Sequence, residues 1–179
     1  MSPTDAHGGY LVRAETLEGV DLQGLARAAL ERDGQPSTSA GLLVSVSGPE
    51  RVIRLAYDGP HTYGKSGAAW YRDHHALAAA LSLALPVTVH AYSFDPDAFE
   101  AVSTYGGGAR VGGETVVYDE LDLDLEELSE PAFEEVREGW PLGRLARLLG
   151  MSRGALLRLP YAPGQLLPLD GPPLDLGPL

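Results

Sequence analysis

Short stretches in which apolar and polar residues alternate recur along the chain, and this period of two is typical of half-buried strands. Five stretches fit the pattern: residues 10–16, 41–47, 51–59, 87–94 and 109–123. The second and third are separated by Gly48-Pro49-Glu50, which predicts a tight hairpin turn. The last contains Gly112-Gly113, so it predicts either one strand or a second hairpin around these two glycines.

Other stretches have apolar residues at helical spacing and a capping or breaking residue at each end. Residues 21–34 predict a helix that Asp21 caps and Gly34 ends. Residues 73–85 predict a second helix, which is capped by Asp73 and closed by a proline. Three further helical segments are expected: a short capped helix over 95–108, one within 131–139, and a helical region over 139–160.

These elements predict an α+β or mixed α/β fold, in which helices flank one mostly antiparallel or mixed sheet. A chain of 179 residues has the size of one domain, and no repeat or linker divides it, so residues 1–179 are expected to form a single domain. Proline and glycine are frequent in residues 164–179, which predicts an extended C-terminal tail that is ordered only if it docks.

The composition narrows the classes of function. The chain has no cysteine, which excludes disulfides, thiol catalysis and cysteine-ligated zinc. No apolar run reaches the roughly 18 residues of a membrane span, and the N-terminus lacks signal-peptide features, so we expect a cytoplasmic protein without membrane insertion. A net charge of −12 disfavours nucleic-acid binding and is compatible with a basic protein partner, although it also serves solubility.

The charges are distributed unevenly. Residues 118–138 are rich in carboxylates and contain one arginine, whereas residues 139–163 contain four arginines and no acidic residue. The two segments either pair within the molecule or present separate faces, the acidic one to a basic partner. In the second case, aromatic residues from the middle of the chain are expected to anchor the contact. The predicted partner-binding residues are Asp122, Asp124, Glu126, Glu127, Trp70 and Tyr105.

Residues 59–66, GPHTYGKS, fit the pattern G-x-x-x-x-G-K-[ST] and resemble the P-loop of nucleoside triphosphatases. The resemblance implies that the backbone from Gly59 to Gly64 wraps phosphates. It also implies that Lys65 reaches the β- and γ-phosphates and that Ser66 binds Mg²⁺. A P-loop needs a buried parallel strand before it and a helix N-terminus after it. The preceding stretch alternates like an antiparallel hairpin strand, so a plain connecting loop is the preferred interpretation.

Asp73-His74-His75 resembles the metal-binding signature of the DHH phosphoesterases. In this sequence it opens an alanine-rich helical stretch, where an aspartate is favoured by capping and by the helix dipole. No two histidines lie four residues apart on one helical face. We therefore expect a helix cap at this position and no metal site.

Residues 142–159, LGRLARLLGMSRGALLRL, resemble a helix-turn-helix, with Gly150 at the turn and Ser152 capping the second helix. In a DNA-binding protein Arg153 and Arg158 would face the groove. The neighbouring acidic stretch would repel phosphate, so we expect a structural pair of helices over 139–160 rather than a DNA reader. The residues expected to be buried against the domain are Leu145, Leu148, Leu149 and Leu156.

The sequence contains no recognisable catalytic constellation, so the preferred function is that of a non-enzymatic, acidic protein-binding module. Its concrete forms would be a bacterial toxin-neutralising (immunity-type) protein or an adaptor or assembly subunit that docks a basic partner. The alternatives are a P-loop nucleotide-binding protein that uses residues 59–66 and a DNA-binding regulator that uses residues 139–160. No cofactor is expected, and the oligomeric state stays open.

Overall fold

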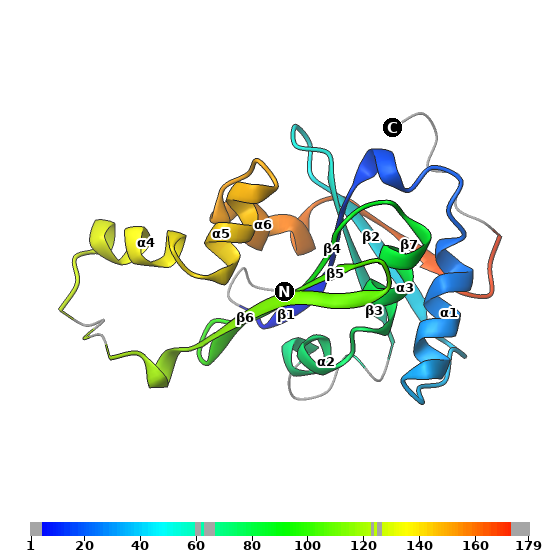
Figure 1. Cartoon of the computed structure of the whole chain (residues 1–179), viewed down its shortest axis with the longest axis horizontal. Coiled ribbons are helices and arrows are strands. Elements are labelled where there is room, and N and C mark those ends of the chain that lie inside the picture. Colours follow the sequence, from blue (N-terminus) through cyan, green and yellow to red (C-terminus); the bar gives the residue numbers. More distant parts are fainter. Residues whose placement is uncertain (1–4, 60–61, 63–66, 123, 125–126, 173–179) are drawn as a thin grey trace.

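A seven-stranded sheet, antiparallel throughout, forms the centre of the computed structural model, which describes residues 5–59, 62, 67–122, 124 and 127–172 (Figure 1). With helices on both faces, the sheet makes a single α+β domain, as the sequence predicts. The five predicted strands are present, the first of them beginning three residues early, at His7. The strand order is β6 (Ala109–Val117), β5 (Phe99–Gly106), β4 (Val89–Asp95), β1 (His7–Arg13), β3 (Val52–Asp58), β2 (Gly41–Val46) and β7 (Gly164–Pro168).

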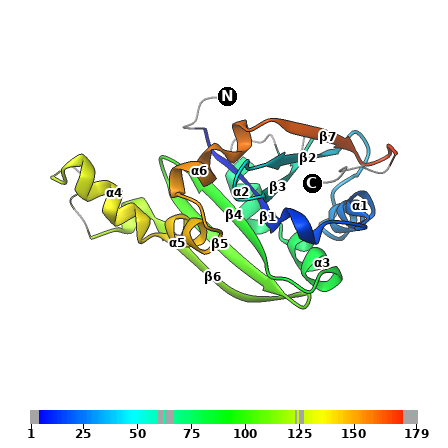
Figure 2. The ribbon, with the colours of Figure 1, turned by 90° about the horizontal axis from the view of Figure 1, so that it is seen from above.

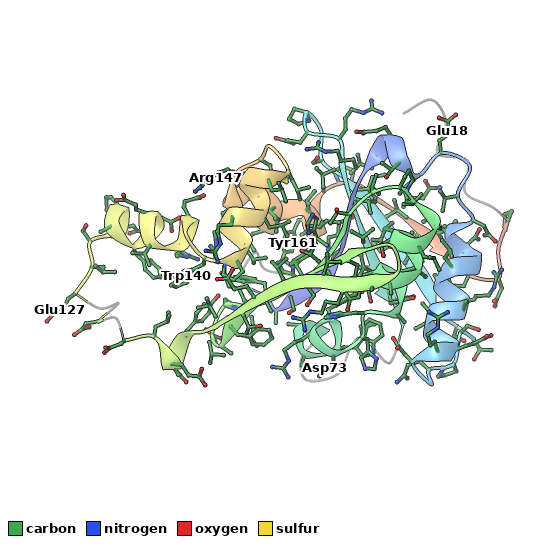
Figure 3. All side chains as sticks on the ribbon, viewed as in Figure 1. Glu18, Asp73, Glu127, Trp140, Arg147 and Tyr161 are labelled. Carbon is green, nitrogen blue, oxygen red and sulfur yellow. The ribbon has the colours of Figure 1, made fainter. Side chains whose placement is uncertain are left out.

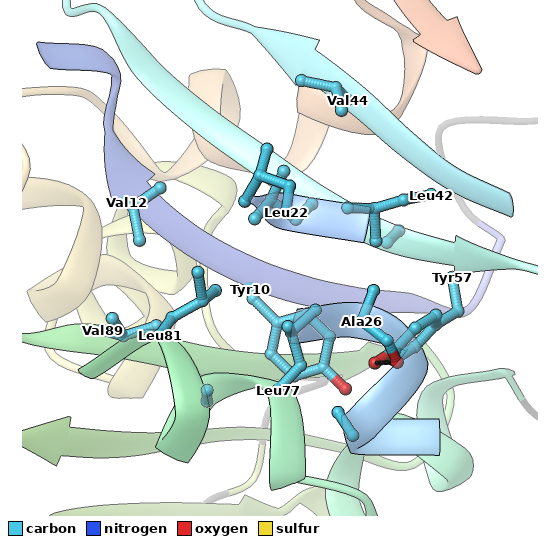
Figure 4. Close-up of a cluster of buried hydrophobic side chains, with 14 of the residues drawn as sticks. Tyr10, Val12, Leu22, Ala26, Leu42, Val44, Tyr57, Leu77, Leu81 and Val89 are labelled. Carbon is cyan, nitrogen blue, oxygen red and sulfur yellow. Dashed lines mark hydrogen bonds between the residues drawn. The ribbon is translucent and has the colours of Figure 1, made fainter. Parts of the chain in front are cut away.

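One face of the sheet is covered by α1 (Leu22–Arg32), α2 (Gly67–Asp73) and α3 (Ala76–Ala84) (Figures 1 and 2). As predicted, α1 begins after Asp21, whose carboxylate accepts a hydrogen bond of 2.9 Å from the backbone of Gly24. Tyr10 of β1 is fully buried beneath these helices and contributes to the larger of the two main cores (Figure 4). Other members of this core are Val12, Leu22, Ala26, Leu42, Tyr57, Leu77, Leu81 and Val89.

The opposite face is covered by α5 (Pro141–Leu148), α6 (Arg153–Arg158) and the short helix η3 (Leu159–Tyr161) (Figure 2). Successive side chains of a strand point to opposite faces, so Leu11 lies on this side while Tyr10 lies on the other. The remaining helices are η1 (Ala14–Thr16), η2 (Tyr118–Glu120) and α4 (Glu130–Glu138). No helix within the described ranges is long and apolar enough to cross a membrane.

The region between β4 and β6 differs from the prediction. Residues 95–108 form a turn and strand β5, not a capped helix. The Asp95 carboxylate accepts a hydrogen bond of 3.0 Å from the backbone of Asp97, and the same local chemistry caps helices, which explains the error. The turn after β5 lies at Gly107 and Gly108, whose φ angles are 59° and 86°. Gly112-Gly113 therefore lies inside β6, so of the two predicted alternatives the structure has the single strand and not the hairpin.

Two further boundaries change. The predicted helix over 73–85 is divided, because α2 ends at Asp73 and α3 follows His75, so Asp73 does not cap the alanine-rich helix. The predicted tail is ordered over β7, which pairs with β2 along one edge of the sheet. The side-chain amide of Gln23 donates to the Pro168 carbonyl at 2.7 Å, so α1 also holds this segment. The tail is ordered where it docks, and residues 173–179 lie outside the described part.

Candidate functional site

The acidic segment forms an arm that extends away from the sheet, as the two views in Figures 1 and 2 agree. We define the acidic arm as residues 119–138, of which residues 123, 125 and 126 lie outside the described part. Its C-terminal portion is α4, a predicted helix that contains no buried residue. The residues that flank the arm meet at its base, where Tyr118 stacks on Trp140 with ring centroids 5.3 Å apart. Phe133 of α4 also meets Trp140 edge-on, with ring centroids 6.2 Å apart, so aromatic contacts around Trp140 join the arm to the body.

The arginines that follow the arm do not neutralise its carboxylates. Among the described residues, none of these four arginines forms an ion pair with an acidic side chain of the arm. The internal pairing considered from the sequence is therefore absent from the described structure. The acceptors are Glu114 for Arg144, the backbone carbonyl of Glu138 for Arg147 and the Glu100 carboxylate for Arg153, while Arg158 is exposed at the end of α6.

The predicted contact residues on the arm are accessible. Asp122, Asp124 and Glu127 are exposed, and Glu127 lies at the tip of the drawn arm (Figure 3). The ion pair found within the described part of the arm joins Glu134 to Arg137 at 2.8 Å, three residues apart on α4. Glu126 belongs to the residues outside the described part. The arm therefore presents carboxylates to solvent with little local compensation.

The two predicted aromatic anchors lie in the body of the molecule, on α2 and β5, and not beside the arm. Trp70 is half-buried and stacks on His74, with ring centroids 4.6 Å apart. Tyr105 is only 8% exposed, and its ring meets that of His75 edge-on at 5.5 Å. The structure therefore does not gather the six predicted partner-binding residues into one surface.

The phosphate-binding motif has a different setting from that of a P-loop. The strand before it, β3, is antiparallel to both of its neighbours, β1 and β2. Gly59 follows β3, and its carbonyl accepts a hydrogen bond of 2.8 Å from the hydroxyl of Thr62. A helix follows the motif, but α2 begins at Gly67 and has only seven residues. Gly64, Lys65 and Ser66 lie outside the described residues. A P-loop needs a parallel strand before it, and the antiparallel β3 does not meet this requirement.

The Asp-His-His segment links α2 to α3. The Asp73 carboxylate lies 3.4 Å from the guanidinium of its neighbour Arg72, and His74 lies 3.3 Å from the carboxylate of Asp33. His75 precedes α3 and makes no side-chain capping bond, so none of the three residues caps that helix as expected. No group of three potential metal ligands occurs within the residues that the structure describes.

The two C-terminal helices agree with the predicted helix-turn-helix in their local structure. Gly150 between them has a φ of 78°, and the Ser152 side chain caps α6 by accepting a hydrogen bond of 3.1 Å from Ala155. Arg153, which would face the groove in the DNA-binding alternative, is buried and paired with Glu100. Leu148, expected in the core, is 65% exposed, whereas the other three predicted leucines are buried. The helices and the burial of these three leucines were predicted correctly, and the burial of Leu148 was not.

A buried ionic cluster around Glu100 was not foreseen from the sequence. Glu100 is fully buried on β5, and its carboxylate accepts hydrogen bonds of 2.5 Å from Arg153, 3.0 Å from the backbone of Leu142 and 3.3 Å from the hydroxyl of Tyr118. Burial raises the pKa of Tyr118, and the adjacent carboxylate raises it further. The cluster fastens α5 and α6 to the sheet. Treating residues 95–108 as a helix concealed it, since only an extended β5 points Glu100 toward these helices.

A second buried polar cluster lies on the same face of the sheet, on β1, β3 and β4. Tyr92 lies 3.0 Å from His7 Nδ1 and accepts a hydrogen bond of 3.0 Å from Arg54 Nε. Arg54 also donates to the carbonyl of Gly8 at 2.5 Å, and forms no ion pair among the described residues. Burial, followed by the charge of Arg54, lowers the pKa of His7 to about 3. His7 is therefore neutral at physiological pH.

Comparison with protein-family models, curated protein sequences and solved structures finds no match for this chain. The fold and the site define a single α+β domain with a projecting acidic arm.

Proposed function

We propose that the chain is a non-enzymatic protein-binding module that docks a basic protein partner through the acidic arm. The observation that carries the proposal is the set of exposed carboxylates on the arm that have no cationic partner among the described residues. A toxin-neutralising protein and an adaptor or assembly subunit are its two concrete forms. The proposal includes a cytoplasmic location, as the sequence analysis expects.

The physical reason for such an arm is the rate of association. Uncompensated like charges repel one another and do not stabilise the fold, but they attract an oppositely charged partner over about one Debye length, roughly 8–10 Å at physiological salt. Exposed charges mainly raise the association rate, and buried aromatic contacts mainly slow dissociation. Of the two predicted anchors, the proposal keeps Trp70, because Tyr105 is only 8% exposed.

The test uses two variants with the same change in charge. One carries Asp122→Asn, Asp124→Asn and Glu127→Gln on the arm. The control carries Glu15→Gln, Glu18→Gln and Glu31→Gln, three exposed acidic residues near α1 and η1. Affinity purification with mass spectrometry first identifies the partner, and surface plasmon resonance then measures association and dissociation rates of the purified pair over a range of salt concentrations.

We expect the arm variant to associate more slowly and with a weaker salt dependence, while its dissociation rate and melting temperature change little. The control is expected to keep the association rate of the wild type. Equal association rates for the arm variant and the wild type would contradict the proposal. A lowered melting temperature together with an unchanged association rate would show that the arm carboxylates serve the fold instead.

A further inference from the structure

A cavity of about 420 Å³ lies on the side of the sheet that α2 and α3 cover, and none of its lining residues belongs to the acidic arm. Its floor consists of β4 and β5 residues with small side chains, paired across the two strands as Ala91 with Ser103 and Ser93 with Ala101. Because none of these four side chains extends far from the backbone, they leave a hollow. The cavity has the volume of a small-molecule site, which is usually a few hundred cubic ångströms.

The floor offers hydrogen-bonding groups that the protein does not use. Ser93 and Ser103 are 1% and 7% exposed, and neither hydroxyl hydrogen-bonds to another described side chain or backbone group. Both residues line the cavity, so water or a ligand inside it can satisfy their hydroxyls. Thr115 of β6, which pairs with Ala101, adds a third hydroxyl to the wall.

The charged residues of the lining are predominantly cationic, in a chain with a net charge of −12. Arg72, Arg110 and Asp73 contribute two positive charges and one negative charge, which leaves one net positive charge. The Arg72 guanidinium lies 5.0 Å from the ring centroid of Phe99, which orients it, and Arg110 Nε donates to the Gly112 carbonyl at 3.3 Å. Both arginines keep further N–H groups available for an anion.

His75 completes the lining with an acceptor. Its Nε2 lies 2.8 Å from the carbonyl oxygen of Tyr71, and because a carbonyl oxygen can only accept, Nε2 is the donor in this hydrogen bond. Burial lowers the pKa of His75, and the nearby Arg110 lowers it too, while the Tyr71 carbonyl and the carboxylates of Asp73 and Asp33 oppose this shift. A neutral ring that donates through Nε2 leaves Nδ1 as a hydrogen-bond acceptor.

From these features we propose that the cavity between α2 and strands β4, β5 and β6 binds a small organic anion that carries a carboxylate or phosphate group and a hydroxyl. Arg72 and Arg110 supply the charge-assisted hydrogen bonds to the anionic group. The uncharged part lies over the floor of small residues, where Ser93 and Ser103 donate to it. The hydroxyl of the ligand donates to His75. This site is independent of the acidic arm, so its failure would leave the proposed protein-binding function untouched.

The test is a titration of the ¹⁵N-labelled protein with inorganic phosphate, citrate and adenosine monophosphate in separate experiments, at an ionic strength held constant with sodium chloride. We expect saturable shifts in the amide signals of Ser93, Ser103 and Thr115 with at least one probe. A response to citrate alone assigns the carboxylate class, and a response to the two phosphates alone assigns the phosphate class. In Arg72→Gln/Arg110→Gln the dissociation constant should rise at least about tenfold, since charge-assisted hydrogen bonds are lost.

Two variants separate binding in the cavity from attraction to surface charge. Arg32→Gln/Arg158→Gln removes two exposed arginines elsewhere on the surface and should bind as the wild type does. Ser103→Val keeps both cavity arginines but removes a hydroxyl and adds bulk to the floor, and it should weaken binding of the same probe. The proposal is overturned if none of the three probes gives saturable shifts, or if the shifts persist undiminished in Arg72→Gln/Arg110→Gln while that variant retains the wild-type fold.

Discussion

Arg153 of α6 donates a hydrogen bond of 2.5 Å to Glu100 of β5, and the two side chains are 4% and 0% exposed. These residues are 53 positions apart in the sequence, so this ion pair fixes the C-terminal helices to the sheet. It also removes from the surface one of the two arginines that a DNA-binding helix-turn-helix would use. The contact therefore supports a structural role for residues 139–160.

Breaking this pair should destabilise the fold more than replacing it. Arg153→Met leaves the buried Glu100 carboxylate without its counter-charge, and we expect a loss of about 3–5 kcal/mol in the free energy of unfolding. The double variant Glu100→Gln/Arg153→Met carries no buried charge at this site and should lose less than the single variant. Urea denaturation monitored by circular dichroism measures both. A loss below about 1 kcal/mol for Arg153→Met would show that the pair is not important for stability.

The two neighbouring leucines at the end of α5 provide a matched pair. Leu149 is 6% exposed and Leu148 is 65% exposed, so the same substitution tests burial alone. Leu149→Ala should cost about 2–5 kcal/mol through lost burial and a cavity. Leu148→Ala should stay within about 0.5 kcal/mol of the wild type. Equal losses in thermal or urea unfolding would contradict the placement of α5 on the sheet.

His7 should make the protein less stable in acid, because the unfolded chain takes up a proton on this residue at a higher pH than the folded protein does. The folded state holds the pKa of His7 at about 3, below its ordinary value of 6.5, so the unfolded chain binds this proton more readily. The contribution of His7 to stability is complete above pH 6.5 and is lost as the pH falls toward 3, by at most about 1.4 kcal/mol per pH unit. His7→Phe should therefore show a shallower fall in stability between pH 6 and pH 4. Parallel curves for wild type and variant in urea titrations would rule out this origin.

The lysine of the phosphate-binding motif is expected to be dispensable. Because β3 is antiparallel to both neighbours, the sheet lacks the setting that a P-loop needs at residues 59–66. Lys65→Ala should leave partner binding and the melting temperature unchanged, within about 0.5 kcal/mol in stability. Isothermal titration with ATP and Mg²⁺ should give the same result for the parent protein and for Lys65→Ala. Saturable binding that Lys65→Ala abolishes in a folded protein would restore the nucleotide-binding alternative.

Local sequence patterns predicted those parts of the fold that depend on local interactions. The hairpin of β2 and β3 follows from alternation around Gly48-Pro49-Glu50, and α1 follows from helical spacing after Asp21. Strand β5 was missed because Asp95 forms a local turn that resembles a helix cap. The strand is formed through pairing of residues 99–106 with β4 and β6, which the local sequence does not reveal. Tertiary pairing also formed β7 from a segment rich in proline and glycine.

The candidate site divides in the same way. The density of carboxylates between Asp119 and Glu138 made an exposed acidic segment predictable from charge alone. The partners of the arginines were not predictable, since Glu100 and Glu114 lie on strands that are distant in sequence. The cavity above β4 and β5 was also hidden, because it depends on the register that sets Ala91 opposite Ser103.

The stacking of Tyr118 on Trp140 brings together two points that are 22 positions apart in the chain. The two ends of the acidic arm therefore lie as close together as the ends of a short loop. Residues can be inserted or deleted between these two rings without altering the register of β5 and β6 or the seat of α5, and lengthening such a loop costs little entropy. Under the proposed function, a change in the length or sequence of this insertion would alter the docking surface while conserving the scaffold.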